Sequence, residues 1–400
     1  MFESAALPHE VDKATYDAEE PQLREDLLDA QFDLVEARAF PVIVLLAGLD
    51  GAGKGEAINR LYGWLDVHYL ETSAFAEPTD EERERPRLWR YWQALPRKGK
   101  IGVFFGSWYQ EPITAFVLGR IGEAEFEREL QAINRLELML AREGALILKF
   151  WFHLSADEQR KRLKKAKKDR DKAWYEFELA TGIKHRDEAV AAGERVARIT
   201  STGHAPWIVV ASGDRRYRDL TLGRTLLHAI RRRLDDPGPS TTFAAAPAVL
   251  PSLDGRTVLD GLDLSQKLEQ TDYDRLLADH QLRLAALMNR RRFGERAVAA
   301  VFEGSDAAGK GGAIRRITRR LDARRYRVHT FAAPTEEERA QPWLWRFWRR
   351  LPRCGHLAVF DRSWYGRVLV ERVEGFAAEA EWLRAYGEIN DFEAELTAGG

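Results

Sequence analysis

The sequence predicts an α/β protein built from two tandem domains, each with a parallel sheet and a glycine-rich phosphate-binding loop. Two loops of the form GxxxxGK occur 256 residues apart, at residues 48–55 and 304–311. Each follows a short apolar run and precedes a helical pattern, which is the setting in which this motif binds phosphate. The same shift aligns Trp-rich, Pro-rich and Glu-rich segments far beyond the loops, so the sequence contains a duplicated domain.

The elements of the first repeat follow from the spacing of its apolar residues. Residues 23–35 have helical spacing, and the apolar run 42–47 predicts the strand that leads into the loop. Farther along, the patterns predict a buried strand at 145–153, a very basic helix at 158–172, a strand at 207–211 and a last helix ending near Arg233. This order of strands and helices is typical of a parallel sheet.

The second repeat begins after a stretch rich in Pro, Ala and Ser, which we interpret as a linker. A helix is predicted at 273–288, a strand at 298–302 and a second strand at 356–360. The register with the first repeat holds from there to Gly400, so roughly 90 residues of the first unit have no counterpart, and we expect an incomplete second domain. The predicted domains are 1–234 and 265–400, joined by a linker at 235–264.

Composition restricts the function classes. A chain of 400 residues with 45% hydrophobic and 31% charged residues suits two globular domains, and no apolar run is long enough to cross a membrane. Cys354 is the only cysteine, and residues 1–10 lack the features of a signal peptide, so we expect a cytoplasmic protein. A net charge of −1 argues against general nucleic-acid binding.

The two copies differ where catalysis would need charge. In the second copy Asp361 ends a strand beside the phosphate loop, the position that holds Mg²⁺ in such folds, and Arg362 follows it. The first copy has Phe105 and Gly106 there, and Glu111 stands where the second has Arg367. We therefore expect the second copy to be catalytic and the first to be a degenerate, structural copy, although a surface ion pair is the alternative interpretation of 361–362.

The metal ligands must also depart from the usual pattern. The residue after the loop lysine is Gly55 or Gly311, where many related loops carry a Ser or Thr that holds Mg²⁺. The oxygen ligands must then come from elsewhere, and Asp306 within the loop and Asp361 at the strand end are the candidates.

Residues 339–353 interleave arginine with tryptophan. On a helix, Trp345 and Trp348 would share one face, which we interpret as buried, and the opposite face would carry Arg346, Arg349, Arg350 and Arg353. That basic face either follows a polyanion through bidentate guanidinium contacts or is simply solvated. The basic run 160–172 likewise resembles the mobile lid of nucleotide kinases, with a solvated face as the alternative.

Together these motifs resemble the polyphosphate kinase 2 family, and the duplication resembles its two-domain class, the polyphosphate:AMP phosphotransferases. The motifs that carry the resemblance lie at 302–312, 333–338 and 361–367, with 200–207 and Asp214 in the first unit. The resemblance implies a P-loop kinase-like three-layer α/β/α fold. It also implies Mg²⁺-dependent transfer of a terminal phosphate from inorganic polyphosphate to AMP, giving ADP.

The resemblance also assigns roles. Asp306 and Asp361 would hold Mg²⁺, and Lys310 would bind phosphate together with the backbone of the loop that contains Gly304, Ala307, Ala308, Gly309 and Gly311. The basic residues Arg353, Arg362 and Arg367 would neutralise charge on the donor and in the transition state, and Thr335 and Arg346 are further candidates for phosphate or nucleotide binding. The duplication resembles a fused dimer, and a homo-oligomer stays open.

Two other functions fit parts of the pattern. An ATP-dependent nucleoside monophosphate kinase would usually keep Ser or Thr after the loop lysine and would need an adenine pocket for its donor. A non-catalytic nucleotide- or polyphosphate-binding protein would not need Asp306, Lys310 and Asp361 together. The choice between AMP and ADP as acceptor, the polyphosphate length and the direction of the reaction stay open.

Overall fold

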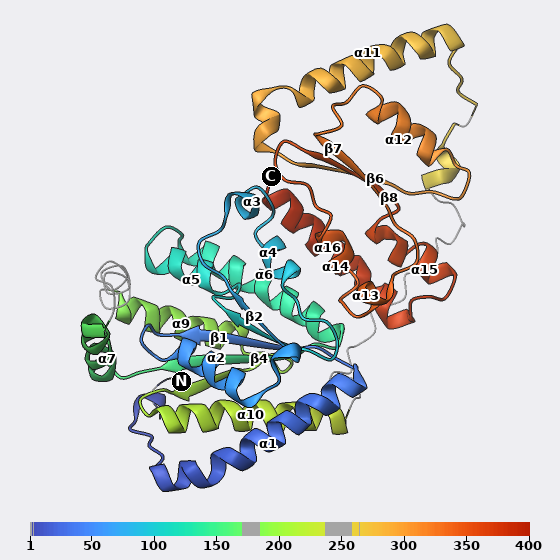
Figure 1. Ribbon diagram of the computed structural model, residues 1–400. Coiled ribbons are helices and arrows are strands. Elements are labelled where there is room, and N and C mark those ends of the chain that lie inside the picture. Colours follow the sequence, from blue (N-terminus) through green and yellow to red (C-terminus); the bar gives the residue numbers. More distant parts are fainter. Residues whose placement is uncertain (1, 3, 170–184, 237–257, 264) are drawn as a thin grey trace. The chain divides into compact units, whose positions relative to one another are not determined.

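A computed structural model describes residues 2, 4–169, 185–236, 258–263 and 265–400 (Figure 1). The chain forms two compact units. Unit 1 contains Met1–Glu77, Tyr91–Thr241 and Glu336–Trp343. Unit 2 contains Pro78–Arg90, Thr242–Thr335 and Leu344–Gly400. Most of the predicted linker, residues 237–257 and 264, lies outside the described residues.

Unit 1 is built on a five-stranded parallel sheet in the order β2-β3-β1-β4-β5. The strands are β1 (Val42–Gly48), β2 (Leu70–Ala74), β3 (Ile101–Phe105), β4 (Leu146–His153) and β5 (Trp207–Ala211). The central strands β1 and β4 are almost wholly buried, which is why they consist of continuous apolar runs instead of alternating ones. The strand predictions at 42–47, 145–153 and 207–211 are therefore confirmed within one residue.

Helices cover both faces of this sheet, giving three layers (Figure 1). One face carries α1 (Lys13–Ala37), α2 (Lys54–Trp64) and α10 (Arg215–Asp235), and the other carries α5 (Gln110–Val117), α6 (Glu123–Arg142) and α9 (Arg186–Thr200). The predicted helix 23–35 is thus part of a longer helix. The predicted basic helix corresponds to α7 (Ala156–Asp169), and its expected continuation to residue 172 lies outside the described residues.

Unit 2 repeats the first half of this arrangement. Its strands β6 (Val298–Phe302), β7 (Tyr326–Thr330) and β8 (Leu357–Asp361) form a parallel sheet in the order β6-β8-β7. By the 256-residue shift these strands correspond to β1, β2 and β3, and the order is the same. The main helices are α11 (Gln270–Met288), α12 (Lys310–Thr318) and α16 (Glu379–Ala398). The predicted α/β class with parallel sheets is confirmed in both units.

The arginine- and tryptophan-rich segment 339–353 is not one continuous helix. The structure has two single turns here, α13 (Glu336–Arg339), which ends where the segment begins, and α14 (Trp345–Trp348). Pro342 and Pro352 flank the second turn and lack the N–H groups that a continuous helix needs. Trp345 and Trp348 are buried as predicted, and Arg349 and Arg350 are exposed.

The remaining helices are short. Those in the Pro-rich segments of the first copy are α3 (Asp80–Arg83) and α4 (Trp89–Gln93), and α15 (Val370–Val373) follows β8. Among the described residues, no helix combines the length and the apolar character that a bilayer crossing requires.

Candidate active site

The second phosphate loop turns sharply between β6 and α12. Gly304 has φ 147°, Ala307 has φ 63° and Gly309, which precedes the helix, has φ 89°. These left-handed values turn successive backbone N–H groups to one side of the loop, where the N-terminus of α12 adds its dipole. The loop therefore has the backbone geometry of an anion cradle.

Lys310 lies over this loop. Its Nζ donates hydrogen bonds to the carbonyl oxygens of Gly304 (2.7 Å) and Ser305 (2.8 Å). Lys310 is only half-buried, so a phosphate in the cradle can reach its amino group through a small change of rotamer. The predicted phosphate-binding lysine is thus at the mouth of the loop.

Asp361 is the last residue of β8 and pairs in register with Phe302, the last residue of β6. The strand end and the start of the phosphate loop are therefore neighbours in the sheet. The backbone N–H of Arg362 donates to the carbonyl oxygen of Phe302 (3.0 Å), and its Nη2 donates to Oδ1 of Asp306 (2.6 Å). Sequence reasoning placed these residues in one site, and the structure brings them together.

Glu303 is a site residue that sequence reasoning missed. Its Oε1 accepts hydrogen bonds from the backbone N–H (2.7 Å) and the hydroxyl (2.6 Å) of Ser363. These bonds hold the turn after β8 against the start of the phosphate loop. The signal was available, because the first copy has Ala47 at the position of Glu303.

A second supporting carboxylate comes from α16. Glu393 Oε1 accepts from the indole Nε1 of Trp364 (2.9 Å) and from the hydroxyl of Tyr365 (2.7 Å). The hydrogen bond to Glu393, with partial burial, raises the pKa of Tyr365 to about 12, so the phenol stays protonated and keeps donating. Unit 1 has the same arrangement, with Glu137 accepting from Trp108 (3.0 Å) and Tyr109 (2.8 Å).

The other predicted phosphate ligands have protein partners of their own. The Arg367 guanidinium lies 3.1 Å from Glu371, Arg353 lies 3.7 Å from Glu84, and Arg346 donates to the Ala332 carbonyl oxygen (2.9 Å). Arg346 also stacks over the Phe331 ring at 4.9 Å. Thr335 is exposed, and its counterpart Thr79 caps a helix. The phosphate-binding roles of these four residues stay predictions.

The donor set at the second loop suits magnesium. Asp306 and Asp361 offer carboxylate oxygens on two neighbouring segments, and the Asp306 side chain is 89% exposed. Among the described residues no group of three or more His, Cys, Asp or Glu side chains gathers as a metal site. Mg²⁺ commonly takes only one or two protein carboxylates and completes its octahedron with substrate phosphates and water, so two aspartates fit it.

The first phosphate loop has the same backbone but different surroundings. Lys54 Nζ donates to the carbonyl oxygens of Gly48 (2.8 Å) and Leu49 (3.0 Å), just as in the second loop. Two side chains of α7 also bond to this loop: Gln159 donates to Asp50 O (3.0 Å) and Arg162 to Gly51 O (3.1 Å). At the strand end, Phe105 replaces the aspartate.

A parallel sheet with a glycine-rich loop at a helix N-terminus, beside a strand-end carboxylate and an arginine, defines a phosphate-loop protein of the kinase-like class. The sequence model described as Polyphosphate kinase 2 (PPK2) matches residues 10–236 and 267–400. The chain belongs to the polyphosphate kinase 2 family.

Individual relatives agree with this assignment. A "Polyphosphate:AMP phosphotransferase" of Pseudomonas aeruginosa is 51% identical over 401 residues, covering 100% of this chain and 81% of the relative. One of the same name from Acinetobacter johnsonii is 34% identical, covering 95% of this chain and 77% of the relative. A crystal structure of a Pseudomonas aeruginosa protein assigned to polyphosphate kinase 2 has a TM-score of 0.87 at 50% identity, covering 100% of this chain and 80% of that one.

Proposed function

We propose that this protein transfers the terminal phosphate of inorganic polyphosphate to AMP, giving ADP, and that unit 2 performs the transfer with Mg²⁺. The observation that carries the proposal is the cluster at the second phosphate loop, where Arg362 bonds to Asp306 beside Asp361. The names of the relatives support the choice of substrates. A bare phosphate chain as donor needs cations and no base pocket, which suits a site rich in arginine.

The reaction is an in-line displacement. A phosphate oxygen of AMP forms a bond to the terminal phosphorus of polyphosphate while the bridging P–O bond breaks, and the polyphosphate leaves one unit shorter with the electron pair on its new terminal oxygen. Catalysis of such a step rests on positioning and on cations around the transferred group. The N–H groups of the loop and Lys310 hold the phosphate, and Arg362 neutralises the charge that develops.

Asp306 and Asp361 would hold the magnesium ion. When bound, Mg²⁺ neutralises charge on the phosphate oxygens of donor and acceptor. Glu303 and Glu393 act as positioning residues, because both fix the turn that carries Arg362. Glu303 bonds to Ser363 of this turn, and Glu393 bonds to Trp364 and Tyr365.

The proposal includes a division of labour between domains at 1–234 and 265–400, joined by the linker at 235–264. The first domain lacks the strand-end aspartate and its phosphate loop is bonded by α7, which supports a non-catalytic role. A cytoplasmic location is also part of the proposal, because Cys354 is the only cysteine. A homo-oligomer is compatible with it, and light scattering of the purified protein measures that.

The test is ADP formation from AMP and Mg²⁺, with polyphosphate or ATP as donor in parallel reactions. Product from polyphosphate alone is the expected result. Product from ATP alone would instead assign an ATP-dependent monophosphate kinase. If neither donor yields ADP while AMP or polyphosphate still binds, the protein is a non-catalytic binding protein and the proposal fails.

A further inference from the structure

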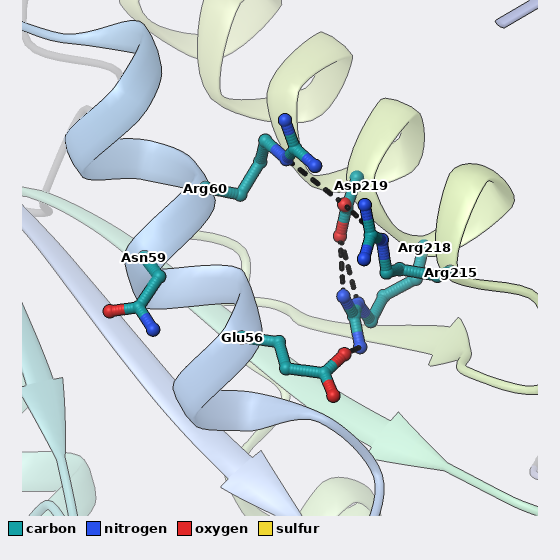
Figure 2. A pocket seen from close by; sticks show the side chains of 6 residues that line it. All are labelled: Glu56, Asn59, Arg60, Arg215, Arg218 and Asp219. Carbon is teal, nitrogen blue, oxygen red and sulfur yellow. Dashed lines mark hydrogen bonds and ion pairs between the residues drawn. The ribbon is translucent and has the colours of Figure 1, made fainter.

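Unit 1 contains a charged cavity of about 370 Å³ next to its phosphate loop. The cavity is lined by Glu56, Asn59, Arg60, Arg215, Arg218 and Asp219. Figure 2 shows that these side chains come from two helices, α2, which starts at the loop, and α10, and that Glu56 and Arg60 extend toward α10. A volume of this order is within the range of ligand-binding pockets, about 300–1,000 Å³.

The lining has more positive than negative charge. One buried carboxylate, that of Asp219, lies between all three guanidinium groups: Arg218 donates to it at 2.8 and 2.9 Å and Arg60 at 3.3 Å, while Arg215 lies 3.9 Å away. The Arg215 side chain is 62% exposed. Because Arg215 is largely exposed and Arg60 is partly exposed, an anionic ligand can reach donors of both, although Arg60 also lies 3.9 Å from Glu20.

Arg218 links the cavity to the phosphate loop. It is fully buried, and a Cβ added at Gly53 would fall 1.8 Å from its Nη1, so the guanidinium fills the space left by the missing side chain of that glycine. Burial, and next the positive charge of Arg218, lower the pKa of Arg162, which bonds to the same loop. Positive charge therefore gathers on this side of the loop.

Glu56 provides the remaining negative charge. Its Oε2 lies 3.0 Å from Nη1 of Arg218, yet its side chain is 63% exposed. A carboxylate in solvent that neutralises a buried guanidinium occupies the place where an external oxyanion would bind. Gly312 stands at this position in the second copy, so only the first copy has this internal anion.

We propose that the cavity between α2 and α10 binds a phosphate group, held by Arg60, Arg215 and Arg218 in place of the Glu56 carboxylate. The ligand class is inorganic phosphate or the terminal phosphate of a nucleotide or of polyphosphate. The site is separate from the proposed catalysis in unit 2, and it gives unit 1 a binding function of its own.

The experiment is calorimetric titration of the full-length chain and of two variants with inorganic phosphate, with AMP and tripolyphosphate as further ligands. Arg215→Ala removes an exposed donor and should weaken phosphate binding about three- to fivefold, and Glu56→Gln removes the competing carboxylate and should tighten it by a similar factor. The second phosphate loop is unchanged in both variants, so its contribution to the measured binding is the same as in the parent chain. The ligand whose affinity changes most identifies the source of the phosphate group.

Two control variants test whether the effect is local. Arg231→Ala removes a positive charge from the far part of α10, where Arg231 pairs with Asp33, and Glu127→Gln removes a carboxylate from α6. Both should leave phosphate affinity unchanged. The proposal is overturned if the controls shift affinity as much as Arg215→Ala and Glu56→Gln do. It is also overturned if neither the parent chain nor Glu56→Gln binds any of the three ligands.

Discussion

Two residues of the proposed active site have backbone conformations that disfavour side chains. Ala307 and Arg362 have φ of 63° and 65°, and the first copy has glycine at both positions, Gly51 at 77° and Gly106 at 75°. A left-handed conformation costs a residue with a Cβ about 1–2 kcal/mol, and such residues persist mainly at functional sites. The second copy therefore keeps strain at both segments that meet around Asp306.

Ala307→Gly should raise stability without loss of activity. Glycine removes the left-handed strain but loses more entropy on folding, so we expect a net gain of about 0.5 kcal/mol and a slightly higher melting temperature. The backbone N–H that would face phosphate is retained. Ala308→Gly is the matched control, because Ala308 does not have positive φ and its replacement should destabilise the protein. Equal shifts in both variants would contradict the role given to the backbone.

Asp361→Asn should abolish most turnover while leaving the fold intact. Asparagine keeps the shape of the side chain but removes the negative charge proposed to hold Mg²⁺, so kcat should fall at least about 100-fold. The measurement is initial ADP formation over a range of Mg²⁺ concentrations. Glu374→Gln, a change of the same kind at an exposed site, should have no effect. Full turnover by Asp361→Asn would refute the assignment of the site.

At the scale of elements, one buried ion pair ties β4 to α6 in unit 1. Lys149 Nζ donates to Glu137 Oε2 (2.7 Å), to Thr200 O (2.6 Å) and to the Tyr109 hydroxyl (3.1 Å), and both charged side chains are inaccessible to solvent. Removing one partner of a buried pair leaves an uncompensated charge, which is costly.

Glu137→Gln should therefore destabilise unit 1 by about 3–5 kcal/mol. Lys149→Met should also be costly, because it leaves the carboxylate alone. In the double variant no buried charge remains, so its loss of stability should be clearly smaller than the sum of the single losses. Thermal or urea unfolding of the four proteins measures this coupling. Additive losses would show that the pair does not act as a unit.

His153, at the end of β4, predicts that the stability of the folded chain depends on pH. Burial, and next the charge of Arg186, lower the pKa of His153 to about 4, below its ordinary value of 6.5. The folded chain thus holds the His153 imidazole neutral. The stability that comes from this lowered pKa is complete above pH 6.5 and is lost as the pH falls toward 4. Between pH 7 and pH 5 the loss should be about 2 kcal/mol.

Urea unfolding at pH 7 and pH 5 checks this, with His153→Phe for comparison. The His153 ring packs 5.3 Å from Phe2, so an aromatic replacement keeps that contact and removes the titration. The variant should lose clearly less stability over this pH range than the parent chain does. A loss of the same size in both proteins would assign the pH dependence to other groups.

For the whole molecule, the two phosphate loops provide a matched pair of variants. Lys54 and Lys310 make the same two bonds to carbonyl oxygens of their loops, so replacing either by alanine should cost similar stability, about 1–2 kcal/mol. Only Lys310→Ala should also lower kcat, by about 100-fold or more, because only the second loop has the strand-end carboxylate and arginine. Equal losses of activity would refute the proposed division of labour.

Much of the fold was predictable because the sequence is duplicated and its two copies can be compared. The apolar runs at 207–211 and 298–302 have the lengths of the observed strands β5 and β6, because short apolar runs are typical of strands in parallel sheets. Asp361 was recognisable from its place after such a run. The two single helical turns around 339–353 did not follow from side-chain spacing alone, because the prolines at 342 and 352 interrupt a helix there. Glu303 was missed because its partner Ser363 is 60 residues away, and only the comparison with Ala47 of the first copy marks it.

Gly106 limits which substitutions could give the first copy the residues of the second. A Cβ at this position would lie 2.5 Å from the carbonyl oxygen of Phe75, a distance that real side chains do not adopt. Placing an Asp-Arg pair at 105–106 would require two substitutions and also a shift of the backbone after β2. A designer who wished to transplant the pair onto the first copy would therefore have to redesign the neighbouring backbone as well as the two side chains.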